Sequence, residues 1–131
     1  MAKQYTFNKD ERLKSRKLIE HLFQKGKSFS AYPFKVIYDF NVERDQLLQA
    51  GVAVSSRNFK RAVERNRVKR VIREVCRLQK LPLQNLLKEQ DKHLIVFFIY
   101  TGKELPVFDE LKARMETVLQ KLLAVIQNQS Q

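Results

Sequence analysis

Residues 57–80 have the sequence RNFKRAVERNRVKRVIREVCRLQK. The segment contains no glycine or proline and keeps helical periodicity for about six turns, so it predicts one long helix closed by Pro82. On a helical wheel, one stripe is apolar at the i, i+4, i+7, i+8 spacing of a core-facing surface, and it consists of Val68, Ile72, Val75 and Cys76. We expect this stripe to anchor the helix.

The opposite arc of the same helix is basic. It collects Asn66, Lys69, Arg70, Arg73 and Arg77. Arginine can fork onto phosphate oxygens, asparagine can donate and accept at a base or ribose edge, and lysine adds a point charge. A basic helical face can be merely solvated. In this helix, however, like charges at i, i+4 repel by about a few tenths of a kcal/mol per pair, and few acids are nearby to offset them. A helix that keeps this repulsion is more easily explained if a polyanionic partner binds the face.

The positive charge of the chain is concentrated in this helix. Residues 57–80 hold ten Lys or Arg against two Glu, a net charge of +8 out of the +12 of all 131 residues. A pI near 10 favours a nucleic acid, an anionic membrane surface or an acidic protein as partner. The uneven placement indicates a binding patch, and nucleic acid suits it best.

The rest of the chain predicts a mixed α/β sandwich, with helices on one small sheet. The expected elements are a helix over 15–25 with Ser15 as N-cap and Gly26 as stop, strands over 29–40, 47–55 and 93–100, and a last helix with apolar positions from Leu111 to Ile126. The continuous apolar run at 94–99 indicates a strand covered on both faces. Residues 84–92 fit either a short helical turn or a mobile loop.

Length and composition indicate one domain over 1–131, with flexible tails at 1–9 and 127–131. Cys76 is the only cysteine, which excludes an internal disulfide and the four-cysteine and paired Cys/His metal sites. No secretory signal or apolar stretch of about 20 residues is present, so we expect a cytoplasmic protein with no membrane partner.

The run RAVERNRVKRVIRE, residues 61–74, resembles the arginine-asparagine-arginine signature of the ribonuclease P protein family. The similarity extends to the glycine-led strand at 51–55 and to the helix at 15–23, and covers roughly residues 10–127. It implies an α/β fold like the second domain of a ribosomal small-subunit protein. The long basic helix then lies in a left-handed crossover between parallel strands, although general rules favour a right-handed one.

The resemblance also implies the partners, which are the catalytic RNA of ribonuclease P and the 5′ leader of precursor tRNA. In the family the RNA supplies the magnesium-dependent active site that removes the leader, and the protein assists. The residues implied to face RNA are Arg65, Asn66, Arg67, Lys69, Arg70 and Arg73. The helical wheel adds Arg77. Arg57, Lys60 and Arg61 could compensate for paired lysines that the family often has where this chain has Ser56-Arg57.

The family's leader-binding cleft lies between its first helix, the sheet and the basic helix. By position we assign Phe23 and Ile37 to this cleft, together with Asn66. An aromatic residue is common in the family where this chain has Ile37, and Tyr38 either replaces it or points into the core. Phe23 has an alternative role as a core residue of the first helix.

No catalytic residue and no metal site of the protein itself are predicted. His21 and His93 lie in unrelated segments, and Glu64 and Glu74 are about 15 Å apart along one helix, too far for a carboxylate pair. Two other functions remain open. A ribosomal or RNA-chaperone-like protein would bind RNA without a role in cleavage, and a metal-dependent nuclease would have clustered acids near the basic face.

Overall fold

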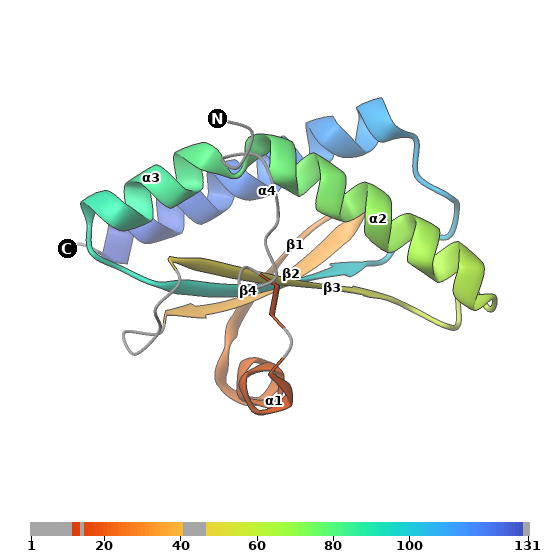
Figure 1. Cartoon of the computed structure of the whole chain (residues 1–131), viewed down its shortest axis with the longest axis horizontal. Helices are drawn as coiled ribbons and strands as arrows, with labels where there is room; N and C mark the ends of the chain where they lie inside the picture. The colour runs from red at the N-terminus through yellow and green to blue at the C-terminus, as the bar shows by residue number, and fades with distance from the viewer. Residues whose placement is uncertain (1–11, 14, 41–46, 130–131) are drawn as a thin grey trace.

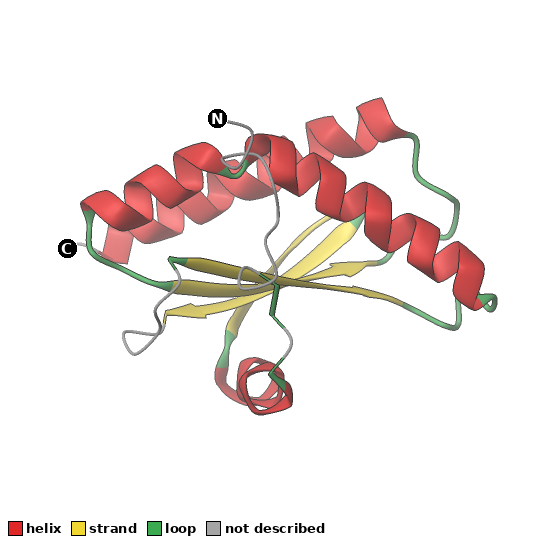
Figure 2. Cartoon of the chain, in the orientation of Figure 1, coloured by secondary structure: helices red, strands yellow, loops and turns green. Residues whose placement is uncertain are grey.

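The computed structural model describes residues 12–13, 15–40 and 47–129, and it consists of one four-stranded sheet with helices on both faces (Figures 1 and 2). In chain order the elements are α1 (Arg16–Lys25), β1 (Lys27–Ala31), β2 (Phe34–Phe40), β3 (Leu48–Val54), α2 (Ala62–Gln79), α3 (Leu81–Glu89), β4 (Leu94–Tyr100) and α4 (Phe108–Gln129). Helices α2, α3 and α4 cover one face, and α1 lies on the other.

The strand order is β1-β2-β4-β3. β2 pairs antiparallel with both β1 and β4, whereas β3 pairs parallel with β4. The chain reaches β4 from β3 by crossing over the sheet through α2 and α3, and the path traced in Figure 1 is left-handed. The mixed α/β fold with this crossover is therefore confirmed.

Two apolar clusters lie on opposite faces of the sheet. The larger contains Val36 and Phe98 and is covered by α2, α3 and α4, while the smaller contains Ile37 and Phe97 and is covered by α1. Neighbouring residues of each strand enter different clusters because successive side chains point to opposite faces. β4 contributes to both clusters, so the prediction of a strand covered on both sides is confirmed.

The predicted strand over 29–40 is wrong as a single element, because the chain turns at Tyr32-Pro33 and forms the β1–β2 hairpin. Proline has no N–H to donate to a strand ladder, which is why it stands between strands rather than within one. The helix over 15–25 is confirmed, with the Ser15 side chain accepting a hydrogen bond from the Leu18 amide.

Two expected helix boundaries need correction, at the start of α2 and at the end of α4. α2 begins at Ala62 rather than at 57; residues 56–58 form a turn, 59–61 are not helical, and Phe59 is buried. The predicted end of the long helix near 80 is confirmed, because α2 ends at Gln79. The chain continues directly into α3, and Pro82 lies in the first turn of α3, where its missing N–H costs nothing. Most of 84–92 is therefore helical. α4 continues to Gln129, so 127–129 are helical; residues 1–9 and 130–131 lie outside the described residues.

Within the described ranges, every helix is too short or too polar to span a lipid bilayer.

Candidate nucleic-acid interface

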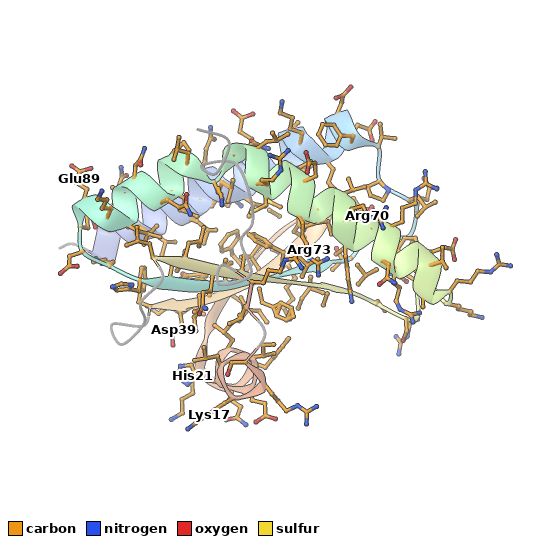
Figure 3. All side chains as sticks on the ribbon, in the orientation of Figure 1. Lys17, His21, Asp39, Arg70, Arg73 and Glu89 are labelled. Carbon is orange, nitrogen blue, oxygen red and sulfur yellow. The ribbon has the colours of Figure 1, made fainter. Side chains whose placement is uncertain are left out.

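The orientation of α2 follows from its apolar stripe. Val68, Ile72, Val75 and Cys76 are all buried in the larger cluster, as the helical wheel predicts. The basic side chains must then turn outward. Figure 3 shows Arg70 and Arg73 on α2, across the sheet from Lys17 and His21 of α1.

These outward side chains surround an open cavity of about 540 Å³, which we name the basic hollow. It is lined by Arg12, Asn66, Lys69, Arg70, Arg73, Glu74 and Arg77. All five residues of the predicted basic arc therefore meet at one place. The lining carries five cationic side chains against one carboxylate, an arrangement that favours a polyanion.

Arg12 was missed by the sequence interpretation. It forms an isolated parallel bridge with Ala50 of β3, and the Leu13 amide donates to the Ala50 carbonyl at 2.9 Å. This pairing brings Arg12 to the side of Arg73, whose pKa is lowered by burial and by the Arg12 charge. No local pattern marks Arg12, because its place depends on a strand far away in the sequence.

One residue of the basic arc, Arg77, forms an ion pair with Glu74. Its Nε donates to Oε2 of Glu74 at 3.0 Å, and this hydrogen bond lowers the pKa of the Glu74 carboxyl. A lowered carboxyl pKa means that the pair contributes stability at neutral pH and loses that contribution as the pH falls through the lowered pKa. At neutral pH a phosphate would therefore compete with Glu74 for Arg77.

The other predicted RNA contacts lie outside the basic hollow. Arg65 donates from Nη1 to the carbonyls of Phe59 and Lys60, both at 2.8 Å, so its guanidinium holds the turn that precedes α2. The remaining four side chains are exposed and do not line the basic hollow: Arg57, Lys60, Arg61 and Arg67.

The residues assigned to a leader-binding cleft are only partly brought together, since Phe23 and Ile37 both lie at the smaller cluster on the α1 face of the sheet. Phe23 is 53% exposed with its ring edge-on to Phe97 at 5.5 Å, so it is not simply a core residue. Ile37 is buried in the same smaller cluster as Phe97. Asn66 lines the basic hollow, to which neither Phe23 nor Ile37 belongs.

Tyr38 is a correction. It lies on the opposite face of the sheet from Ile37, buried in the larger cluster with its ring against Phe29 and Phe40. Strand alternation causes this, because consecutive residues of β2 cannot share a face. Tyr38 therefore does not replace the family's aromatic residue.

The remaining titratable side chains are dispersed. His21 Nε2 lies 2.8 Å from Oδ2 of Asp39 at the surface between α1 and β2, and Cys76 is buried. Among residues 12–13, 15–40 and 47–129, no group of three or more His, Cys, Asp or Glu side chains is placed to hold a metal ion.

Comparison with known proteins gives one consistent result. The family model described as Ribonuclease P matches residues 7–123. The ribonuclease P protein component of Porphyromonas gingivalis is 37% identical over 116 residues, covering 88% of this chain and 85% of the relative. That of Bacillus pumilus is 36% identical over 121 residues, covering 92% and 94%. The structure of Staphylococcus aureus RNase P protein, at 24% identity, shares the fold with a TM-score of 0.65 over 86% of this chain and 94% of that one.

Proposed function

Since this chain belongs to the ribonuclease P protein family, we propose that the basic hollow is the surface through which it binds the catalytic RNA of that enzyme. The chain is the protein component of ribonuclease P, which acts in maturation of the 5′ end of tRNA. The observation that carries the proposal is the meeting of Arg12 with the basic arc of α2, five cations around one hollow.

The binding energy of such a surface is mainly electrostatic. Each phosphate that a lysine or arginine neutralises releases condensed counterions, so affinity falls steeply as salt rises. Arg70 and Arg73 offer planar forks for phosphate oxygens, and Asn66 offers an amide for a base or ribose edge. We place the cleavage chemistry and its magnesium ions in the RNA, as the family resemblance implies. The part of this chain is then to screen phosphate repulsion and to position the substrate.

For the 5′ leader of precursor tRNA we propose the α1 side of the sheet. Support comes from Phe23, whose ring stands more than half exposed against Phe97 and offers a stacking surface to an unpaired base. Ile37 lies in the apolar cluster beneath it. The cytoplasmic location and the single-domain organisation stay predictions.

The test is precursor tRNA cleavage at low magnesium with bacterial ribonuclease P RNA alone, the protein alone, and both together. We expect a correct mature 5′ end to form efficiently only with both. If the protein binds the RNA but adds nothing to cleavage, it is a general RNA-binding or chaperone-like protein. Cleavage by the protein alone would contradict our placement of the chemistry.

Replacing Arg12 by glutamine is expected to weaken RNA binding without harming the fold. One phosphate contact would be lost. In a plot of log affinity against log salt concentration, the slope should therefore become shallower by about 1. The thermal midpoint should stay the same or rise slightly, because the repulsion between Arg12 and Arg73 disappears. Arg16→Gln is the matched control, since Arg16 is exposed on α1 and does not line the basic hollow. Equal effects of the two variants on RNA affinity would show that Arg12 has no special place.

A further inference from the structure

A second polar cavity lies at the end of the sheet where the parallel strands β3 and β4 finish. We name it the strand-end hollow; its volume is about 600 Å³, and its lining includes Ser55, Ser56, Arg57, Asn58, Thr101 and Lys103. Because parallel strands end at the same edge of a sheet, the loops after β3 and β4 meet here (Figure 1). In open α/β sheets this edge is the usual place for ligands.

The loop after β4 is held firmly. The Thr101 amide donates to the Pro33 carbonyl at 2.8 Å, and the Tyr100 hydroxyl donates to the Glu104 carbonyl at 2.9 Å. Gly102 lies between these two hydrogen-bonded positions and is buried. A Cβ at this position would come within 2.6 Å of the Tyr100 ring, so a larger residue would not fit without a shift. The backbone on both sides of Lys103 is therefore fixed by its neighbours.

The loop after β3 is equally constrained and is joined to the first. The Arg57 amide donates to Oγ of Ser55 at 3.1 Å, and the Asn58 side chain donates to the Gly102 carbonyl at 3.4 Å. Phe59 is buried with its ring 6.1 Å from that of Tyr100. Arg57 and Lys103 come from segments far apart in the sequence. They line the same hollow because the hydrogen bond from Asn58 to Gly102 joins their two loops.

The chemistry of the strand-end hollow suits a phosphate. Two cations and the hydroxyls of two serines and one threonine line it, and none of its described lining residues is acidic. Tyr100 also lines it, but its hydroxyl donates to the Glu104 carbonyl. Arg57 can fork onto two phosphate oxygens, Lys103 adds a point charge, and the hydroxyls can donate to the remaining oxygens. Because the backbone of both loops is held by hydrogen bonds, little backbone conformational entropy would be lost when an anion binds.

We propose that the strand-end hollow binds a phosphodiester group of an RNA strand, with Lys103 as the partner of Arg57. This inference rests on the proposed function and extends it. The RNA-binding surface would run from the basic hollow past the segment just before α2, where Lys60 and Arg61 are exposed, to the loop between β4 and α4. The phosphodiester belongs either to the catalytic RNA or to the precursor tRNA leader.

The experiment compares Lys103→Ala with Lys88→Ala, which removes the same charge from an exposed position on α3. One arm measures affinity for bacterial ribonuclease P RNA across a salt series. The other measures the affinity of each reconstituted holoenzyme for precursor tRNA with a leader of several nucleotides and with a leader of one.

Lys103→Ala is expected to weaken binding several-fold and to lower the magnitude of the salt slope by about 1, whereas Lys88→Ala and Lys103→Arg match the wild type. A loss in the first arm assigns the phosphate to the catalytic RNA, and a loss only with the longer leader assigns it to the leader. Equal binding by Lys103→Ala and Lys88→Ala in both arms overturns the proposal. Failure of the wild-type protein to activate the RNA would instead overturn the proposed function.

Discussion

Changing Arg70 and Arg73 together to glutamate is expected to leave the protein folded and to remove most of its affinity for the catalytic RNA. The lining of the basic hollow carries five cations and one carboxylate, so the double change takes its net charge from +4 to zero. Two phosphate contacts are lost and two repulsions are added. We expect affinity to fall about a hundredfold or more at roughly 0.1 M salt, with a shallower salt slope.

The fold should tolerate this double change. Arg70 is exposed, and at position 73 a carboxylate would lie beside Arg12 and replace a repulsion by an attraction. Circular dichroism and thermal unfolding check this point, and a salt series of RNA-binding titrations gives the affinities. The matched control is Lys88→Glu with Lys112→Glu, two exposed positions outside the basic hollow. If the control loses as much affinity, net charge alone governs binding; if the double variant binds normally, RNA uses another surface.

The second large effect is expected for Ile72→Ala, which acts on stability. Ile72 is fully buried where the apolar stripe of α2 enters the larger cluster. Removing buried methyl and methylene groups and leaving a cavity costs about 2–5 kcal/mol, a large part of the roughly 5–15 kcal/mol that stabilises a domain. We expect the thermal midpoint to fall by about 10 °C.

Val63→Ala provides the comparison for Ile72→Ala. Val63 is 77% exposed on the same helix, so its truncation should change the free energy of unfolding by less than about 0.5 kcal/mol. Urea and thermal denaturation measure both variants. Saturating RNA should recover part of the Ile72→Ala loss, because a ligand that binds only the folded state stabilises it. Equal stability of the two variants would contradict the packing of α2 through this stripe.

The sequence predicted α2 well because both faces of that helix are encoded locally. Every residue of the apolar stripe is buried, and every residue of the basic arc lines the basic hollow. The β1–β2 hairpin was missed although a local signal existed. Phe29 and Ala31 pack on the larger cluster at odd positions, whereas Phe34 and Val36 do so at even ones. This change of phase, at a proline, marks a turn.

Other parts of the site depend on contacts that no local pattern encodes. Arg12 reaches the basic hollow only because its backbone bridges to Ala50, and the strand-end hollow needs two loops that meet through Asn58 and Gly102. Tyr38 shows the limit of a family resemblance. Along β2, Tyr38 lies at alternate positions with the core residues Phe34 and Val36, and this alternation alone predicts that it is buried in the core. The family resemblance left open whether it lines the cleft or the core.

The pairing of Arg12 and Leu13 with Ala50 has a consequence for solubility as well as for RNA. β3 is an outermost strand of the sheet, and an uncovered strand edge can add a strand from another molecule and so begin aggregation. The bridge at Ala50 and the hydrogen bond from Leu13 occupy part of that edge within the chain itself. The segment of Arg12 and Leu13, which places a cation at the basic hollow, therefore also leaves less of the β3 edge free to pair with a strand of another molecule.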